Sequence, residues 1–408
     1  MRGRRALLLA YRASVGAALW FASGCPAIPG DPFSGKDGGD TQHAAGAGAG
    51  GAGAAGGAGG ELGGDSPDEG GGLADADGDG FTAAEGDCND GDRNVNPGAI
   101  EVVIDEPDGA GNMPEPADED CDGLVDNVLP ACDGDLAPDD FDAMHGANAI
   151  DLCAAASPGD RRWGVLRARY VRGDGSLAEP TAAVGVLDAF GPSVRAQGGA
   201  RMLALSSGRA RAARRPGACG GPSCSSYGPG RAPPGFPQDN PSCPPSSEIH
   251  DDIGLEVVLR APTNATGYEF AFKFYTFEYP EYVCDSFNDQ FLALATPPPP
   301  GSRDGNLSFD SLGNPVSVNI GFFDVCEGCP LGADDLVGTG FGLWNDAGAT
   351  RWLRTQAPVT GGEEITLRFM IFDTGDDMLD STALVDGFRW IARGGTVAVE
   401  TTPVQTPR

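Results

Sequence analysis

Two short acidic loops contain the residues of this sequence that are best suited to chemistry. Asp75–Gly80 reads DADGDG and Asp118–Gly123 reads DEDCDG. Hard cations such as Ca²⁺ take about six to eight oxygen ligands, and carboxylates at alternate positions bring about three of them to one point. The sequence therefore predicts a metal-binding module, with oxygen ligands from Asp75, Asp77, Asp79, Asp87, Asp90, Asp118, Asp120, Asp122 and Asp126.

The available ligand types favour calcium over copper. Residues 75–130 contain no histidine, a single methionine (Met113) and two cysteines that we expect to be oxidised, Cys88 and Cys121. Cu(II) prefers imidazole, and Cu(I) prefers thiolate or thioether. The first loop is not an EF-hand, because Gly86 stands where a bidentate glutamate is required. We expect Ca²⁺, with copper as a minor alternative and an acidic linker without a site as the remaining interpretation.

Charge is concentrated in the same region. The formal net charge is −32, and residues 61–130 hold 21 Asp or Glu and a single base, Arg93. Such a run is either a disordered acidic tail or a cation site. It argues against nucleic acid as a partner. Residues 161–215 hold 11 arginines and three acids, which fit a solvated loop better than a surface that docks an anionic partner.

The first 25 residues have the pattern of an export signal. Four arginines precede the apolar stretch Ala13–Ala22, which is too short to cross a bilayer. The stretch runs into Ala-Ser-Gly-Cys, which resembles a bacterial lipobox whose Cys25 is lipidated. Ala22 departs from the usual leucine, so simple secretion stays as an alternative. We expect an exported protein at the outer membrane or cell surface, held to the membrane by an N-terminal lipid.

The cysteine count fits export, because disulfides persist outside the cytosol. Eleven cysteines less Cys25 leave ten, an even number. The preferred pairs are Cys88–Cys121, Cys132–Cys153 and Cys326–Cys329. The pairing of the remaining four stays open: Cys219, Cys224, Cys243 and Cys284.

Composition divides the chain into five parts. Residues 1–25 are the signal, 26–74 a disordered Gly/Ala-rich tether, 75–130 the acidic module, 131–397 a β-rich domain and 398–408 a disordered tail. A flexible tether of about 50 residues has a reach of roughly 40 Å. The acidic module has few apolar residues, so cations and a disulfide must organise it.

The larger domain has the period-two pattern of half-buried strands. After a helix-like stretch, Phe141–Cys153, apolar residues alternate with others in three stripes. Many short strands between Gly/Pro turns predict a mostly β fold, a β-sandwich or jelly roll. Residues 213–248 predict a disulfide-tied surface insertion. The stripes are Tyr268, Phe270, Phe272, Phe274 and Thr276; Ile365, Leu367, Phe369 and Ile371; and Val316, Val318 and Ile320.

Carboxylates also gather at the ends of these predicted strands. They would repel one another unless cations, backbone donors or arginines such as Arg368 and Arg389 compensate them. One interpretation is turn chemistry, in which Asp and Ser hydrogen-bond their own backbone. The other is a second calcium site. Its candidate residues are Glu278, Glu281, Asp289, Asp376, Asp377 and Asp380, with Asp373 and Asp386 in the same acidic run.

Residues 75–126 resemble a bacterial metal-binding motif family related to MopE-type copper-binding proteins, and more loosely the thrombospondin type 3 repeats. The resemblance implies a metal-binding module, although residues 102–117 form a longer connection than many members carry. The matching segments are Asp75–Phe81, Gly86–Asp90, Asn96–Glu101 and Asp118–Asp126.

Residues 135–395 resemble a second family, the choice-of-anchor L domain of bacterial exported and surface proteins. This resemblance implies a β-rich surface domain and supplies no known activity. The matching segments are Phe272–Cys284, Asn288–Asp289, Gly305–Asp310, Gly338–Phe341, Asp373–Ser381 and Val385–Trp390.

The sequence lacks the G-x-S-x-G, HExxH and P-loop signatures of enzymes. We therefore expect a calcium-binding surface lipoprotein, not an enzyme, whose sandwich attaches to the surface or binds an unknown ligand or glycan. The alternatives are a carbohydrate-active hydrolase that uses sandwich carboxylates and a purely structural envelope protein. An open groove lined by Trp, Tyr and carboxylates would favour ligand binding, whereas a sealed acidic cluster would favour the structural alternative.

Lipidation of Cys25 is directly testable. Mass spectrometry of the mature N-terminus is expected to find a thioether-linked lipid on Cys25, because this cysteine closes the lipobox-like segment. With Pro26 rather than aspartate after it, we expect sorting to the outer membrane. Cleavage elsewhere, or an unmodified Cys25 at the mature N-terminus, would contradict the lipoprotein prediction.

Overall fold

A computed structural model describes residues 74–104, 107, 111, 113–138, 140–343, 346–392 and 396–404. They belong to one compact unit, residues 67–408. Cys25, the predicted signal and all but the last residue of the predicted tether lie outside the described residues. Within the described part of the chain, no helix combines the length and apolar character needed to cross a membrane.

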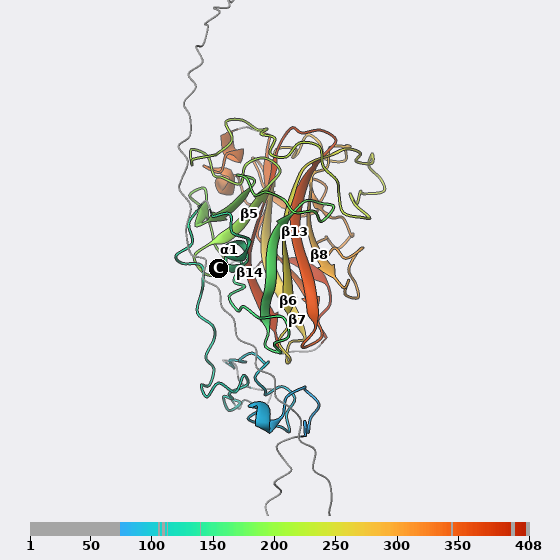
Figure 1. Cartoon of the computed structure of the whole chain (residues 1–408). Helices are drawn as coiled ribbons and strands as arrows, with labels where there is room; N and C mark the ends of the chain where they lie inside the picture. Colours follow the sequence, from blue (N-terminus) through green and yellow to red (C-terminus); the bar gives the residue numbers. More distant parts are fainter. Residues whose placement is uncertain are drawn as a thin grey trace, which may run out of the picture. The chain divides into compact units, whose positions relative to one another are not determined.

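Antiparallel strands make up most of the regular structure (Figure 1). The helices are short: η1 (Ala83–Glu85), α1 (Ala143–Asn148), η2 (Asp334–Leu336) and η3 (Phe341–Leu343). The strands are β1 (Gly164–Val171), β2 (Val184–Leu187), β3 (Ala189–Phe190), β4 (Val194–Arg195), β5 (Met202–Ser206), β6 (Ile249–Arg260), β7 (Gly267–Thr276), β8 (Gln290–Thr296), β9 (Val316–Ser317), β10 (Phe323–Val325), β11 (Gly348–Thr350), β12 (Leu353–Pro358), β13 (Glu364–Thr374), β14 (Ser381–Ile391) and β15 (Glu400–Pro403).

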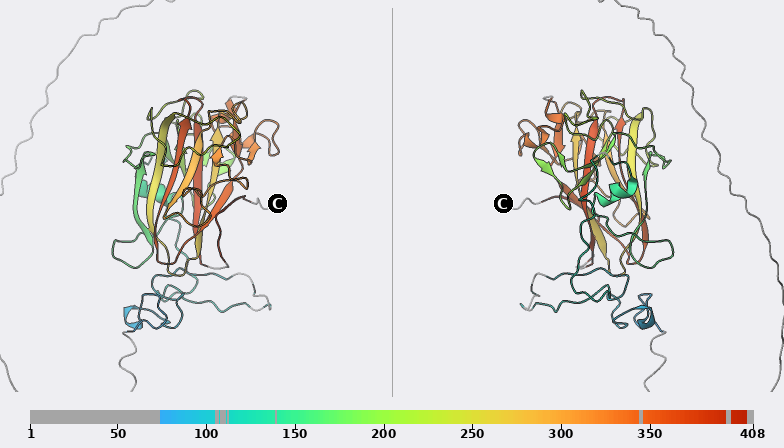
Figure 2. Two further views of the ribbon diagram at one scale, coloured as in Figure 1. Left: turned by 90° about the vertical axis from the view of Figure 1, so that its right-hand side faces the viewer. Right: turned by 60° about the vertical axis from the view of Figure 1, so that its left-hand side comes forward.

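Two sheets pack face to face, and Figure 2 shows the layers from two further directions. The five-stranded sheet has the order β1-β6-β13-β8-β9. The second sheet has the order β10-β11-β7-β14-β5-β2, with β12 paired to β7 and to β15. β3 and β4 form a separate hairpin. The mostly β prediction is thereby confirmed, and the two facing sheets form the predicted sandwich.

Aromatic side chains from both sheets fill the space between them. The rings of Phe270 (β7) and Phe369 (β13) lie 4.9 Å apart, and those of Phe272 (β7) and Phe291 (β8) lie 5.2 Å apart. Burial of each such side chain stabilises the fold by roughly 1.5–3 kcal/mol. Two predicted stripes meet in this core: Tyr268, Phe270, Phe272 and Phe274 from β7, and Ile365, Leu367, Phe369 and Ile371 from β13.

Three predicted elements differ from the structure. The helix is shorter than Phe141–Cys153, because the Asp142 side chain caps its first turn and Asp151 adopts a left-handed φ of 69° just beyond its end. The third predicted stripe, Val316, Val318 and Ile320, is buried, but only its first residue lies in a strand, because β9 ends at Ser317. The predicted disordered tail, residues 398–408, contains β15, which pairs with β12.

Ten cysteines form five pairs. Three of them are the pairs preferred from the sequence, Cys88–Cys121, Cys132–Cys153 and Cys326–Cys329. The four cysteines left open form Cys219–Cys224 and Cys243–Cys284. Both of these pairs involve residues 213–248, which contain no strand or helix, as expected for a surface insertion.

Candidate metal sites

The two acidic loops close in the same way. The Asp75 carboxylate accepts hydrogen bonds from the backbone N–H groups of Gly78 and Gly80, at 2.7 and 2.9 Å. The Asp118 carboxylate accepts from the N–H groups of Asp122 and Gly123, at 3.1 and 2.9 Å. In each loop, the first aspartate therefore bonds the backbone of the turn that follows it.

The two acidic loops also share their backbone conformation. Gly80 and Gly123 occupy equivalent positions with φ of 99° and 90°, a region that glycine enters without steric cost. Cys121 occupies the position equivalent to Gly78, and both have positive φ, 56° and 80°. The disulfide of Cys121 to Cys88 holds this non-glycine residue in the second turn.

Several buried side-chain oxygens in and around the loops receive no hydrogen bond from the described residues. A buried oxygen without a donor costs about 1–3 kcal/mol, and more when it is charged. Around the first loop these atoms are Asp77 Oδ2, Asp79 Oδ2 and Asp87 Oδ2; around the second they are Glu101 Oε2, Asp126 Oδ1 and Asn127 Oδ1.

The loop carboxylates also converge. Ligand oxygens of Asp75, Asp77 and Asp79 lie within 4.8 Å of one another, as do those of Glu101, Asp118 and Asp120. Ligands that each lie about 2.3–2.6 Å from one Ca²⁺ have separations of this size. Each loop therefore has the spacing of a cation site.

The raised pKa values of the loop carboxyl groups also favour a bound cation. Burial raises the pKa of Asp79 and of Asp87, and the nearby charge of Asp77 raises the pKa of both further. Burial likewise raises the pKa of Asp120, with added repulsion from Asp122. A cation among these groups would oppose both effects, because it stabilises the ionised carboxylates.

The structure distinguishes among the predicted ligands. Asp90 accepts the N–H of Ala76 at 3.0 Å, and Asp122 accepts the N–H of Leu124 at 2.8 Å and the Asn127 side chain. Asp75 and Asp118 bond the loop backbone as well, but Asp90 and Asp122 belong to neither converging group of carboxylates. Glu101 completes the second group and was not among the predicted candidates, since nothing in its local sequence shows that it lies beside Asp118.

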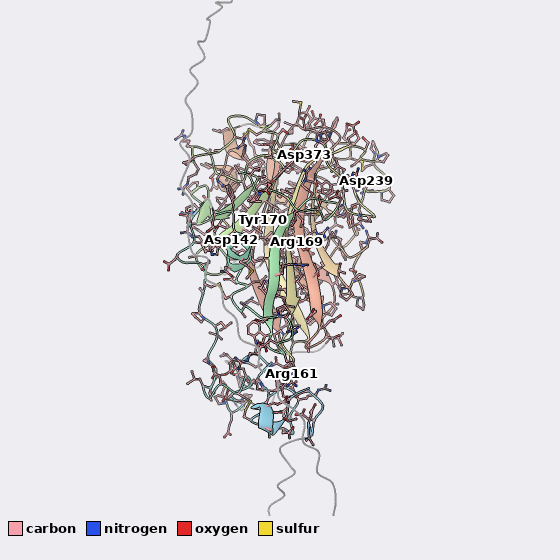
Figure 3. All side chains as sticks on the ribbon, in the orientation of Figure 1. Asp142, Arg161, Arg169, Tyr170, Asp239 and Asp373 are labelled. Carbon is pink, nitrogen blue, oxygen red and sulfur yellow. A yellow bond between two sulfur atoms is a disulfide. The ribbon has the colours of Figure 1, made fainter. Side chains whose placement is uncertain are left out.

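Residues 96–100 attach the acidic module to the sandwich. Asn264 accepts the N–H of Ile100 at 3.0 Å and donates to its carbonyl at 2.9 Å. Trp163 Nε1 donates to the carbonyl of Ala99 at 2.9 Å. The guanidinium of Arg161, labelled in Figure 3, lies 4.5 Å from the centre of the Phe81 ring. Neutral hydrogen bonds, together with the ion pair of Arg161 with Glu85, thus connect the acidic module to the β domain.

A second group of carboxyl groups lies inside the sandwich. We call Glu278, Asp289 and Asp373 the core carboxyl cluster; their exposed fractions are 2%, 0% and 1%. Asp289 accepts the N–H of Thr374 at 3.0 Å and the hydroxyl of Ser381 at 2.7 Å. Burial raises the pKa of all three cluster residues well above the ordinary range.

The other residues predicted for the second site lie outside this cluster. Glu281 and Asp377 are exposed. Asp376 accepts the N–H of Met378 at 3.0 Å, which is the turn chemistry weighed as an alternative. Asp380 accepts the N–H of Cys224, and burial raises its pKa to about 7. Asp380 also lies near Cys219 and Cys224, whose disulfide removes the thiolates that a metal would need.

A cavity of about 270 Å³ opens on another part of the domain. Trp163, Phe388 and Trp390 line it together with Asp151. Burial raises the pKa of Asp151 to about 6, and repulsion from Asp133 adds to the shift. Its lining contains the Trp and Asp residues, but no Tyr, of the open groove that would favour ligand binding. The core carboxyl cluster is a sealed acidic cluster, the feature that would favour the structural alternative.

Comparison with protein-family models, curated proteins and solved structures gives no match. The two family resemblances therefore stay predictions, and the functional argument depends on the geometry above.

The raised pKa of Asp151 predicts a pH dependence of stability. Because the folded protein holds this proton more tightly than the unfolded chain, the contribution is complete below about pH 4 and is lost as pH rises through about 6. Asp151→Asn is expected to reduce the loss of unfolding free energy between pH 4 and pH 8 by about 1–2 kcal/mol, after allowance for solvent screening.

Denaturant unfolding at both pH values measures this effect. The matched control is Asp135→Asn, which makes the same change at an exposed residue. Asp135 and Asp151 both lie between Cys132 and Cys153, which form a disulfide. Equal pH dependence of the Asp151→Asn and control proteins would contradict the prediction.

Proposed function

We propose that this protein is an exported, lipid-anchored cell-surface protein whose acidic module binds Ca²⁺. We further propose that its β-sandwich binds a surface ligand or glycan, or attaches the protein to the surface. The observation that carries the calcium proposal is the convergence of carboxylate oxygens in both loops, together with buried oxygens of Asp77, Asp79 and Glu101 that lack a hydrogen-bond donor.

The donor set supports calcium over copper. The ligand atoms that converge in both loops are carboxylate oxygens, which suit Ca²⁺. Cys88 and Cys121 are joined as a disulfide, and Met113 is exposed. The soft ligands that would hold Cu(I) are therefore absent from these two groups.

A bound ion would have a structural role. Among the described residues of the module, Phe81 and Ala99 are the buried apolar side chains, too few to form a core. An ion in the first loop would offset most of the charge of Asp75, Asp77 and Asp79, and an ion in the second would join Glu101 to Asp118 and Asp120. Sites of this kind in extracellular modules bind Ca²⁺ with a Kd of about 10⁻⁴–10⁻³ M.

Calcium is expected to stabilise the full exported chain. Titration to about 100 times Kd is expected to add about 2.7 kcal/mol for each site, because the ion binds the folded form. Asp77→Asn and Glu101→Gln are each expected to lower the calcium-dependent rise in melting temperature. Calorimetry and thermal unfolding, with and without chelator, measure these effects.

Glu115→Gln is the matched control, since it removes one charge from an exposed position between the loops. An equal loss in Glu115→Gln would show that net charge, not ligation, is responsible. The absence of calcium heat, or copper binding that calcium does not displace, would contradict the proposal.

The aromatic cavity supports ligand binding by the sandwich. Its three aromatic side chains offer apolar faces, and Asp151 offers a hydrogen-bonding group, the combination found in specific binding sites. The enclosed core carboxyl cluster gives less support to a hydrolase, because a polysaccharide cannot reach carboxyl groups that are at least 98% buried.

Trp390→Ala is expected to weaken binding of a ligand found in a screen of cell-surface glycans and peptides by about tenfold or more, as for other aromatic contact residues. Trp352→Ala is the control, because Trp352 is half-buried and is not among the residues that line the cavity. Equal affinity of the two variants would exclude this cavity as the binding site. A screen without any ligand would favour the structural alternative.

A further inference from the structure

We propose that the sandwich binds a hard cation at a further site, the core carboxyl cluster of Glu278, Asp289 and Asp373. This inference goes beyond the proposed function, which assigns calcium to the acidic module alone. Its chemical basis is a group of enclosed carboxyl groups that form no ion pair with a basic side chain of the described residues.

The cluster is formed where three chain segments meet between the sheets. Glu278 follows the end of β7 in one sheet, whereas Asp289 directly precedes β8 and Asp373 lies within β13, both in the other sheet. Figure 3 labels Asp373 near one end of the sandwich. The surrounding side chains include Ser207 and Ser381, so the interior changes here from aromatic to polar.

Asp373 is the residue that most requires a ligand. Its carboxyl group borders Asp289 and the Ser207 hydroxyl, yet neither of its oxygens has a hydrogen-bond partner of ordinary geometry among the described residues. The other two cluster residues do have donors: Asp289 has two, and Glu278 accepts the N–H of Asp289 at 3.1 Å. Both buried oxygens of Asp373 are thus available to a cation.

Two other buried acids of the same domain, Glu256 and Asp252, are neutralised by arginine, whereas acids such as Asp251 and Asp386 accept backbone N–H groups instead. Glu256 lies 2.6 Å from Arg169 and 2.5 Å from Arg368, and Asp252 pairs with Arg172. At the core carboxyl cluster, by contrast, the charged side chains with the largest influence are further acids, among them Asp376 and Asp380. An ion from solution would supply the positive charge that arginine supplies elsewhere.

A shared proton between Asp289 and Asp373 is the competing arrangement, since adjacent carboxyl groups resist double ionisation. One proton, however, engages one oxygen of each partner and leaves the second Asp373 oxygen enclosed without a donor. A cation can take both oxygens. The cluster is looser than the loop groups, whose ligand atoms lie within 4.8 Å, so we expect Ser207 or a backbone oxygen to complete the ligand set.

The test counts bound Ca²⁺ in a full exported chain whose loops have been disabled by Asp77→Asn and Glu101→Gln together. After equilibrium dialysis against calcium, elemental analysis is expected to find a single Ca²⁺ retained, and calcium is expected to raise the melting temperature. Addition of Asp373→Asn is expected to remove both effects. Asp377→Asn is the matched control, because it neutralises an exposed aspartate of the same segment.

The outcomes separate this site from the loops. An unmodified chain that binds no more Ca²⁺ than the loop-disabled chain would contradict the proposed function and leave the core site intact. A loop-disabled chain that retains no Ca²⁺ would overturn the core site, as would an equal loss in Asp377→Asn. A rise in melting temperature on Asp373→Asn, without change in bound calcium, would establish the shared proton instead. If Asp373→Asn does not fold, Glu278→Gln takes its place in the loop-disabled chain. Loss of the retained Ca²⁺ in that variant would support the core site, and an unchanged calcium count would contradict it.

Discussion

The rest of the structure depends on the contact between two aromatic and aliphatic stripes, one on each sheet. Phe270 and Phe272 of β7 meet Phe369 of β13 and Phe291 of β8. Because side chains alternate along a strand, placing these residues inward directs their neighbours outward. Asp373, two residues beyond Ile371 where the apolar stripe ends, is also buried, although the pairing of β13 with β6 shifts between these two residues. The polar end of the interior is thus a direct continuation of the strand that forms the core.

The acidic module is stabilised by different interactions from those of the sandwich. It has almost no apolar interior, and its order comes from aspartates that bond the turn backbone, from a disulfide and from contacts at residues 96–100. Its carboxylate oxygens point inward, although repulsion would push them apart. The sandwich, in contrast, uses arginines to neutralise Glu256 and Asp252. One chain therefore contains acids compensated by its own cations and acids that lack such compensation.

The sequence predicted those parts of the fold that depend on local pattern. The stripes of β7 and β13 follow a period of two, and the D-x-D-x-D-G spacing is itself the loop geometry. Glu101 was missed because only the folded chain brings it to Asp118. Glu281 was included because it lies near Glu278 in sequence, yet it is exposed. β15 has no apolar stripe, and it forms where β12 offers an edge, with Thr401 bonded to Thr355.

The Cys88–Cys121 disulfide has a mechanical consequence. A pull along the backbone is carried across this bond, so residues 89–120 form a closed loop outside the path of the force. That loop contains Glu101 and the Asn96–Ile100 segment, which bonds to Asn264 and Trp163. The Asp75–Gly80 turn lies outside the loop and bears the load. Under tension the first acidic turn would therefore extend before the docking contacts, which makes it the compliant element of the molecule.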